Sequence, residues 1–197
     1  MIDVDVADEH EALVATVGEW GRKDVLPLIH DLDREHRFNR DFLRQMAKLQ
    51  LLGICIPEEW GGAGMDYVSL GLACEELEYV DTHLRVILSV HVGLNSMTLW
   101  CWGTDEQKKK YLVPQARGEK IATYGLTEPN AGSDAVGIQS TAVRKGDRYV
   151  LNGEKMWISL ADVADHFLVV AWTDQEKKKK RDHSGMSAFM VERSFKG

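Results

Sequence analysis

Residues 124–134, which read YGLTEPNAGSD, form the densest group in the chain that could contact a small molecule. Thr127 offers a hydroxyl, Pro129 stiffens the turn, and residues 130–134 favour a loop whose backbone N–H groups can point at an anion. A phosphate would fit such a loop, and a flat heterocycle such as a flavin ring could bond Thr127 and nearby amides along one edge. Composition alone favours the simpler interpretation, a strand that ends in a polar turn.

A second group of this kind follows about twenty-five residues later in the sequence KMWIS, residues 155–159. Trp157 could cover a planar ring, and the hydroxyl of Ser159 could bond it. The alternative is an amphipathic strand with Met156 and Trp157 on opposite faces. By itself this second group is a weak indication of a ligand site.

The elements that must position these groups change character near residue 120. Before it, apolar residues recur at helical spacing and the segments carry helix boundaries. We expect an early helix over about 8–30, interrupted at Pro27, and a later helix that Gly53 closes. Asp66 is a good N-cap, and a T-x-x-Q capping box begins at Thr104. The pattern predicts a bundle of about five helices.

After that point the sequence consists of short β-prone runs separated by turns: IATYGL, QSTAVRK, DRYVLN, EKMWIS, HFLVVAW and MSAFMVE. Lys145-Gly146-Asp147 and the dipeptide Asn152-Gly153 favour tight turns, and QEKKKKR, residues 175–181, is best read as a solvated hairpin loop. The predicted fold is therefore α+β. A helical domain over 1–119 precedes an antiparallel β-barrel or sandwich-like domain over 120–197, which we expect to be incomplete at its C-terminal end.

Composition excludes several classes of function. The 197 residues are 44% hydrophobic with a formal charge of −7, so the chain can bury a core but has no bulk attraction to nucleic acid or anionic membranes. The apolar stretch 82–103 contains two histidines, an arginine and an asparagine, which favour a buried helix over a membrane span. Cys55, Cys74 and Cys101 suggest neither disulfides nor zinc, and the acidic N-terminus lacks signal-peptide features. We expect a cytoplasmic protein.

The order and spacing of the motifs resemble the acyl-CoA dehydrogenase family. The segment at 124–134 matches the family signature, and IPEEWGGAG at 56–64, GTDEQKKKYL at 103–112 and LNGEKMWIS at 151–159 follow the family order. The resemblance implies that FAD binds here, with Thr127 near the pyrimidine edge of the flavin and Ser133 also near the acyl-CoA substrate. The implied cofactor-binding residues are Tyr124, Leu126, Thr127, Gly132, Ser133, Trp157, Ile158 and Ser159.

The family reaction removes a proton beside the thioester and passes a hydride to the flavin, which yields a trans-2-enoyl-CoA. A carboxylate must reach that proton, and the resemblance places it in a C-terminal helical domain that nothing in this chain matches. Glu128 and Asp134 are expected to be structural or solvated, and His91 is expected to be a hydrogen-bonded core residue. The sequence thus predicts no catalytic residue within this chain.

Three functions remain open from the sequence. The first is an FAD-dependent acyl-CoA dehydrogenase, for which the resemblance implies electron-transferring flavoprotein as acceptor and a homotetramer. The second is an acyl-CoA oxidase or flavin monooxygenase of the same fold. The third is a truncated chain without catalysis that serves as a binding module. The acyl group stays open and includes short, medium, branched and dicarboxylic chains; the stretch VDTHLRVILSVH has a slight likeness to the glutaryl-CoA dehydrogenase branch.

Overall fold

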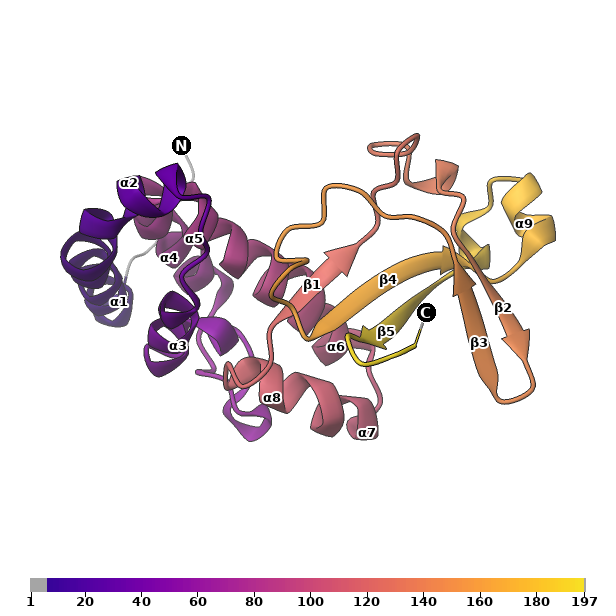
Figure 1. The fold of residues 1–197 in the computed structure, drawn as a ribbon. Helices are drawn as coiled ribbons and strands as arrows, with labels where there is room; N and C mark the ends of the chain where they lie inside the picture. The colour runs from indigo at the N-terminus through magenta and orange to yellow at the C-terminus, as the bar shows by residue number, and fades with distance from the viewer. Residues whose placement is uncertain (1–6, 197) are drawn as a thin grey trace, which may run out of the picture. The chain divides into compact units, whose positions relative to one another are not determined.

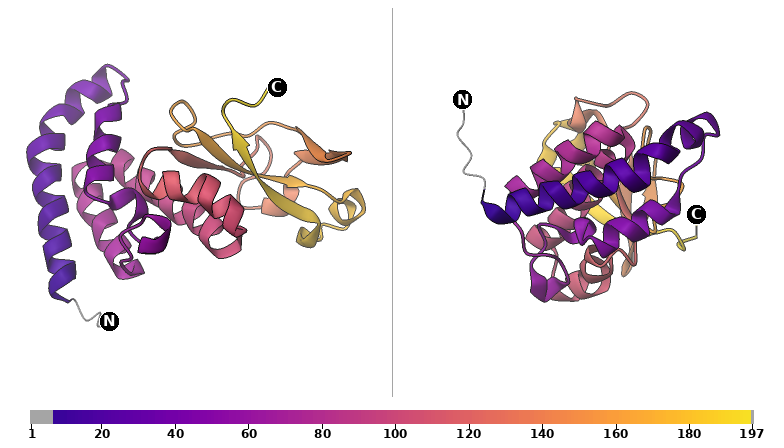
Figure 2. Two further views of the ribbon diagram at one scale, coloured as in Figure 1. Left: turned by 90° about the horizontal axis from the view of Figure 1, so that it is seen from below. Right: turned by 90° about the vertical axis from the view of Figure 1, so that its left-hand side faces the viewer.

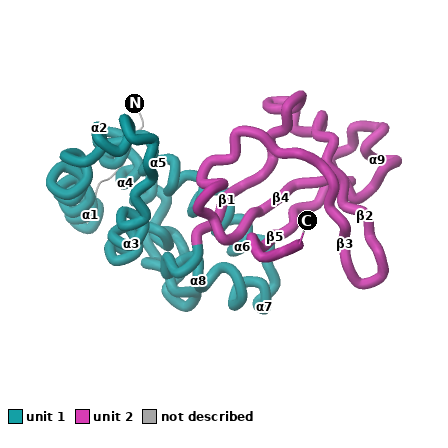
Figure 3. The backbone as a smooth tube through the Cα atoms, viewed as in Figure 1, with its two compact units in different colours: residues 1–120 teal, residues 121–197 magenta. Residues whose placement is uncertain are grey.

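The computed structural model describes residues 7–196. The chain forms two compact units, residues 1–120 (unit 1) and residues 121–197 (unit 2), which Figure 3 distinguishes by colour. Unit 1 is built from helices, and unit 2 is built around a sheet (Figure 1). The predicted order of a helical part followed by a β part is confirmed.

Unit 1 begins with a helical path that the sequence predicted to break. Helix α1 (Asp8–Trp20), a π-helical turn (Gly21–Val25) and α2 (Leu26–Arg34) follow one another without interruption, as both views of Figure 2 show. Pro27 lies in the first turn of α2. A proline is tolerated there because the first turn of a helix can do without its N–H. The predicted interruption at Pro27 is therefore wrong.

Helix α3 (Arg40–Lys48) buries Phe42, Leu43 and Met46, but it ends before the predicted Gly53. Gln50 takes the left-handed conformation, with φ of 58°, and Leu51–Gly53 forms a separate 3₁₀ turn. Gly53 is needed for another reason, since a Cβ at this position would lie 2.6 Å from the backbone oxygen of Ala116. The glycine therefore allows two backbones to approach each other rather than closing the helix.

Two glycines of unit 1 should respond oppositely to alanine. Gly53→Ala pushes a methyl group into the backbone of Ala116, so we expect a loss of about 1–2 kcal/mol in the free energy of unfolding. Gly71, inside helix α4 (Tyr67–Val80), has open space around its missing Cβ, and Gly71→Ala should stabilise by about 0.5–1 kcal/mol. Urea denaturation of both variants tests this prediction. Equal effects would contradict the close approach at Gly53.

Helix α4 (Tyr67–Val80) begins at the predicted N-cap, where the Asp66 carboxylate accepts a hydrogen bond of 2.8 Å from the backbone N–H of Ser69. Hydrogen bonds from Ser69 lower the pKa of Asp66 to about 2, and His10 also contacts this carboxylate. The first helix of unit 1 is thereby joined to the start of α4.

The apolar stretch forms one helical path of α5 (Thr82–Ile87), a π-helical segment (Leu88–Ser96) and α6 (Met97–Trp102). By length and composition this path could cross a membrane. Its apolar side chains nevertheless supply much of the core of unit 1, and Ile87, Leu88 and Val92 are fully buried. Polar side chains are buried in the same path, which is typical of a core helix.

The last helical path of unit 1 consists of α7 (Asp105–Gln107), a π-helical turn (Lys108–Leu112) and α8 (Val113–Ala116). The predicted capping box is present: Thr104 and Gln107 each accept a hydrogen bond from the other's backbone N–H. Together with the preceding elements, the described part of unit 1 is the predicted helical bundle.

Unit 2 contains β1 (Ala122–Gly125), β2 (Thr141–Lys145), β3 (Arg148–Asn152), β4 (His166–Trp172) and β5 (Met186–Glu192). Strand β4 is central because it pairs in parallel with β1, antiparallel with β5, and through Thr141 and Trp172 in parallel with β2. The sheet is thus mixed and open, so the expectation of an antiparallel barrel or sandwich was wrong in these respects.

Two local predictions in unit 2 also require correction. Residues 145–148 form the β2–β3 hairpin with Gly146 at φ of 66°, as expected, but Asn152-Gly153 leads into irregular chain because EKMWIS is not a strand. Residues 175–181 do connect the antiparallel strands β4 and β5, yet they contain a short helix, α9 (Gln175–Lys179), which Asp174 caps.

Candidate functional site

The two segments singled out in the sequence lie side by side in unit 2. The backbone N–H of Met156 donates to the carbonyl of Thr127 at 2.8 Å, and the ammonium of Lys155 donates to the carbonyl of Leu126 at 2.9 Å. Strand β1 contains the first two residues of the first segment, Tyr124 and Gly125, so the sheet fixes one side of this contact. The structure therefore joins the two motifs into one surface.

Glu128 anchors the first segment from inside. Its carboxylate accepts hydrogen bonds from the backbone N–H groups of Gln139 at 2.5 Å and Ser140 at 3.0 Å, and it forms an ion pair of 2.8 Å with Lys155. Burial by itself would raise the pKa of Glu128, but these hydrogen bonds outweigh it and lower the pKa to about 2. A carboxylate held in this way is a poor proton acceptor, so the structural interpretation of Glu128 is favoured.

A tight turn presents the next residues of the first segment to solvent. Glu128 and Ala131 exchange two backbone hydrogen bonds of 2.9 and 3.1 Å, which close the turn over Pro129 and Asn130. Gly132 follows, and a Cβ at this position would meet no atom of the described residues within 4 Å, apart from its two neighbours in the chain. The packing of the described residues therefore does not require a glycine at 132.

The second segment exposes an aromatic ring from a strained backbone. Trp157 has φ of 59° and an exposed fraction of 85%, and Leu160 has φ of 63°. Bulky residues rarely adopt this left-handed conformation, which is characteristic of functional sites. The hydroxyl of Thr123 on β1 donates to the carbonyl of Ser159 at 2.5 Å and holds the segment against the sheet.

The remaining residues predicted for the site lie on these two segments. The side chains of Tyr124, Leu126, Thr127 and Ile158 are half-buried, and Ser133 and Ser159 are exposed. Burial raises the pKa of Tyr124. Within the described part of the chain, the hydroxyls of Thr127, Ser133 and Ser159 make no hydrogen bond, which leaves them available to a ligand.

The structure also agrees with the structural roles expected for Asp134 and His91. Asp134 forms an exposed ion pair of 2.5 Å with Arg181, and its backbone oxygen accepts from Gly137. His91 is fully buried in unit 1, where its Nε2 lies 3.1 Å from the carbonyl oxygen of Gln115. Both arrangements are structural.

Sequence reasoning missed the residue that joins the motifs. Lys155 is the first letter of KMWIS, but a lysine at the start of an expected strand gives no sign of a buried partner. Its partner Glu128 lies 27 positions earlier, and local periodicity carries no information about such a contact. A buried charge pair between two loops becomes visible only in three dimensions.

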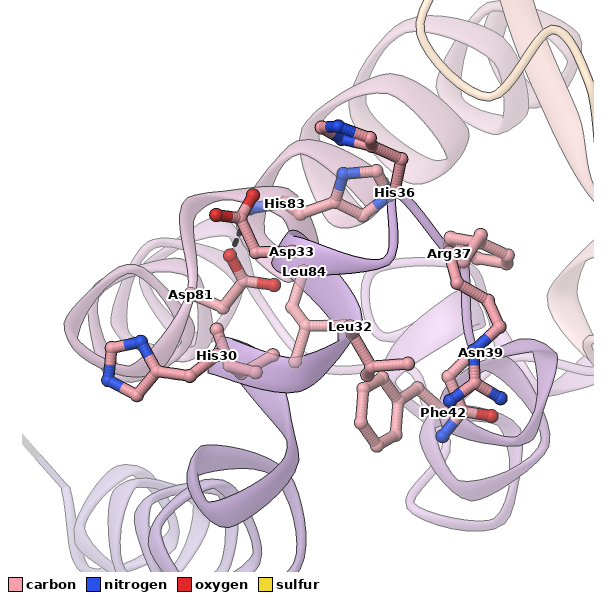
Figure 4. A pocket seen from close by; sticks show the side chains of 12 residues that line it. His30, Leu32, Asp33, His36, Arg37, Asn39, Phe42, Asp81, His83 and Leu84 are labelled. Carbon is pink, nitrogen blue, oxygen red and sulfur yellow. Dashed lines mark hydrogen bonds between the residues drawn. The ribbon is translucent and has the colours of Figure 1, made fainter.

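A separate cleft of about 400 Å³ lies in unit 1 (Figure 4). Its floor is apolar, with Leu32, Phe42 and Leu84, and its rim carries three histidines and two aspartates. The Asp81 carboxylate there accepts from the backbone N–H of His83 and caps α5. No group of three or more His, Cys, Asp or Glu side chains in the described residues is placed to hold a metal ion.

Comparison with known proteins agrees with the two-part organisation. Residues 7–119 match the family model of the acyl-CoA dehydrogenase N-terminal domain, and residues 123–197 match that of the middle domain. The chain is 43% identical over 196 residues to the short-chain-specific acyl-CoA dehydrogenase of Clostridium acetobutylicum, an alignment that covers 100% of this chain and 51% of that protein.

Solved structures give the same result. Butyryl-CoA dehydrogenase from Megasphaera elsdenii superposes with a TM-score of 0.91 at 34% identity, over 98% of this chain and 50% of that one. An acyl-CoA dehydrogenase from Bacillus anthracis, solved in complex with FAD, superposes with a TM-score of 0.87 at 39% identity, over 98% of this chain and 32% of that one.

The chain spans about half the length of the curated relatives that it matches. Within that span, the matched domains follow in the family order and the two motif segments are joined by direct hydrogen bonds. We conclude that this chain belongs to the acyl-CoA dehydrogenase family.

Proposed function

We propose that the protein is an FAD-dependent acyl-CoA dehydrogenase that converts an acyl-CoA thioester to a trans-2-enoyl-CoA, and that this chain supplies the flavin and thioester site. Units 1 and 2 would then be its N-terminal helical domain and its flavin-binding middle domain. The observation that carries the proposal is the joining of the two motif segments at Lys155, beside the exposed ring of Trp157.

The residues present fit a flavin. Gly132 leaves open space, Trp157 offers an uncovered ring for a planar partner, and the hydroxyls of Thr127, Ser133 and Ser159 make no hydrogen bond to the described residues. FAD, when bound, accepts the hydride that leaves the substrate. The residues of the chain would hold the ring edge through Thr127 and Ser159 and orient the thioester through Ser133.

We place the catalytic base outside residues 1–197. Glu128 is the carboxylate inside the motif, and its low pKa and buried ion pair withdraw it from proton transfer. Removal of an α-proton instead needs a carboxylate whose environment raises its pKa toward neutrality. The contribution of this chain is binding and orientation.

For the substrate we propose a short-chain acyl-CoA, because the relatives from C. acetobutylicum and M. elsdenii are named for short-chain and butyryl substrates. We also propose electron-transferring flavoprotein as the electron acceptor, a homotetrameric assembly and a cytoplasmic location. Each of them concerns the protein at its full natural length.

Anaerobic titration of the full-length, FAD-loaded protein tests the function. We expect butyryl-CoA to bleach the flavin absorbance, with octanoyl-, isobutyryl- and glutaryl-CoA less effective, and the reduced enzyme to react slowly with oxygen. Rapid reoxidation by oxygen would point to an oxidase or monooxygenase instead. If no acyl-CoA of any length reduces the flavin, the proposed reaction is wrong.

A further inference from the structure

The charges of the chain are distributed unequally between its two units. Residues 1–120 contain 13 basic and 21 acidic residues, whereas residues 121–197 contain 11 basic and 10 acidic residues. Five of the basic residues in unit 2 are consecutive, Lys177, Lys178, Lys179, Lys180 and Arg181. These five residues, which we call the basic segment, form most of α9 and the turn after it (Figure 1).

Two contacts fix the basic segment beside the first motif. The Arg181 guanidinium forms its ion pair with Asp134, the residue directly after Ser133. The ammonium of Lys178 donates a hydrogen bond of 3.1 Å to the carbonyl of Gln139, a few residues further on. A charge run that is only solvated has no need of such contacts, so the basic segment has a defined place next to the proposed thioester site.

Much of the positive charge of the basic segment stays available at the surface. Lys179 is neutralised by an ion pair with Glu176, and Arg181 by Asp134. Lys178 donates only to a carbonyl, which leaves its charge uncompensated, and Lys180 is exposed and forms no ion pair with the described residues. These two ammonium groups attract an anion without first breaking an existing pair.

We propose that the basic segment, through Lys178 and Lys180, binds the phosphate groups of the CoA part of the substrate. The inference rests on the proposed function, which brings the thioester to Ser133. CoA carries a pyrophosphate and a 3′-phosphate on the part of the molecule farthest from the thioester, and compact, strongly charged lysine ammonium groups are suitable partners for them. The pyrophosphate of FAD offers similar chemistry, so both ligands must be tested.

The test is calorimetric titration of the 197-residue chain with CoA at low and physiological ionic strength. We expect Lys178→Gln with Lys180→Gln to weaken CoA binding roughly fivefold at low salt and to reduce its salt dependence. The matched control, Arg144→Gln with Lys145→Gln on the β2–β3 hairpin, removes two exposed charges that form no ion pair with the described residues, and it should change the affinity less than twofold. Replacing Lys178 and Lys180 by arginine should restore binding, and thermal melting confirms that each variant is folded.

Ligand fragments identify which groups are bound. For dephospho-CoA, the affinities of wild type and the glutamine variant should differ less than they do for CoA. For a pantetheine thioester without phosphates, the two affinities should be equal. Equal CoA affinities in wild type and variant, a wild-type chain that does not bind CoA, or an effect on FAD alone would each overturn the proposal. If the full-length enzyme oxidises butyryl-CoA with the same kcat/KM after the two substitutions, the inference is wrong although the proposed function stands.

Discussion

Replacing Lys155 by methionine should destabilise the chain by about 3–5 kcal/mol, because it leaves the buried carboxylate of Glu128 without its cation. The side chains of Lys155 and Glu128 are only 12% and 6% exposed, so water cannot substitute for the lost partner. The bond to the Leu126 carbonyl is lost as well, and with it a direct link between the motifs. Urea denaturation measures the effect, and FAD affinity should fall with it.

A double-mutant cycle separates the ion pair from general damage. Glu128→Gln combined with Lys155→Met removes both charges, so it should cost less than Lys155→Met alone. Arg148→Met is the surface control, since the Arg148 pair with Asp147 is exposed at both side chains, and it should change stability by less than about 1 kcal/mol. If the changes in the free energy of unfolding caused by Glu128→Gln and Lys155→Met simply add in the double variant, the two side chains are not coupled.

The ion pair of Glu128 and Lys155 predicts that the stability of the folded chain depends on pH. The pKa of Glu128 is lowered from 4.5 to about 2 in the folded chain, so the folded state favours the charged form. Its contribution to stability is fully present above about pH 4.5 and is lost as the pH falls toward 2. The wild-type chain should therefore lose stability over this interval more steeply than Glu128→Gln. Parallel curves for the two proteins would show that the carboxylate is not stabilised as described.

Trp157→Gly should raise stability and weaken FAD binding at the same time. Glycine adopts φ near 59° without the strain of a bulky residue, so we expect a gain of about 1 kcal/mol in the free energy of unfolding. Loss of the exposed ring removes the surface proposed to cover the flavin, and FAD affinity should fall about tenfold. Urea denaturation and quenching of flavin fluorescence give the two values.

Two further variants separate the effect of backbone strain at residue 157 from the effect of losing the aromatic ring. Trp157→Ala keeps a side chain on the strained backbone, so it should lose FAD affinity without the gain in stability. Trp102, on the last turn of α6, has the same exposed fraction of 85%, and Trp102→Ala should leave FAD affinity unchanged. If the two tryptophans contribute equally to FAD binding, exposure alone explains the effect and the assigned site is incorrect.

Several elements could be predicted because their causes are local. Asp66 and Thr104 cap helices through side chains that act within three residues, and Gly146 supplies the positive φ of a two-residue turn. Pro27 and Gly53 were misjudged because their effect depends on context. The π-helical turn before α2 places Pro27 in a first turn, and Ala116, distant in sequence, requires the glycine at 53.

The sequence by itself determined the division into helical and β parts, the family resemblance and the two motif segments, because composition, periodicity and short motifs are properties of neighbouring residues. Only the tertiary structure decided that β1 and β4 pair in parallel, that KMWIS is irregular and not a strand, and that Glu128 anchors the first motif through a buried ion pair with Lys155. Strand partners, buried ion pairs and backbone strain depend on residues far apart in the chain, whose free energies become defined only when the sheet brings them together.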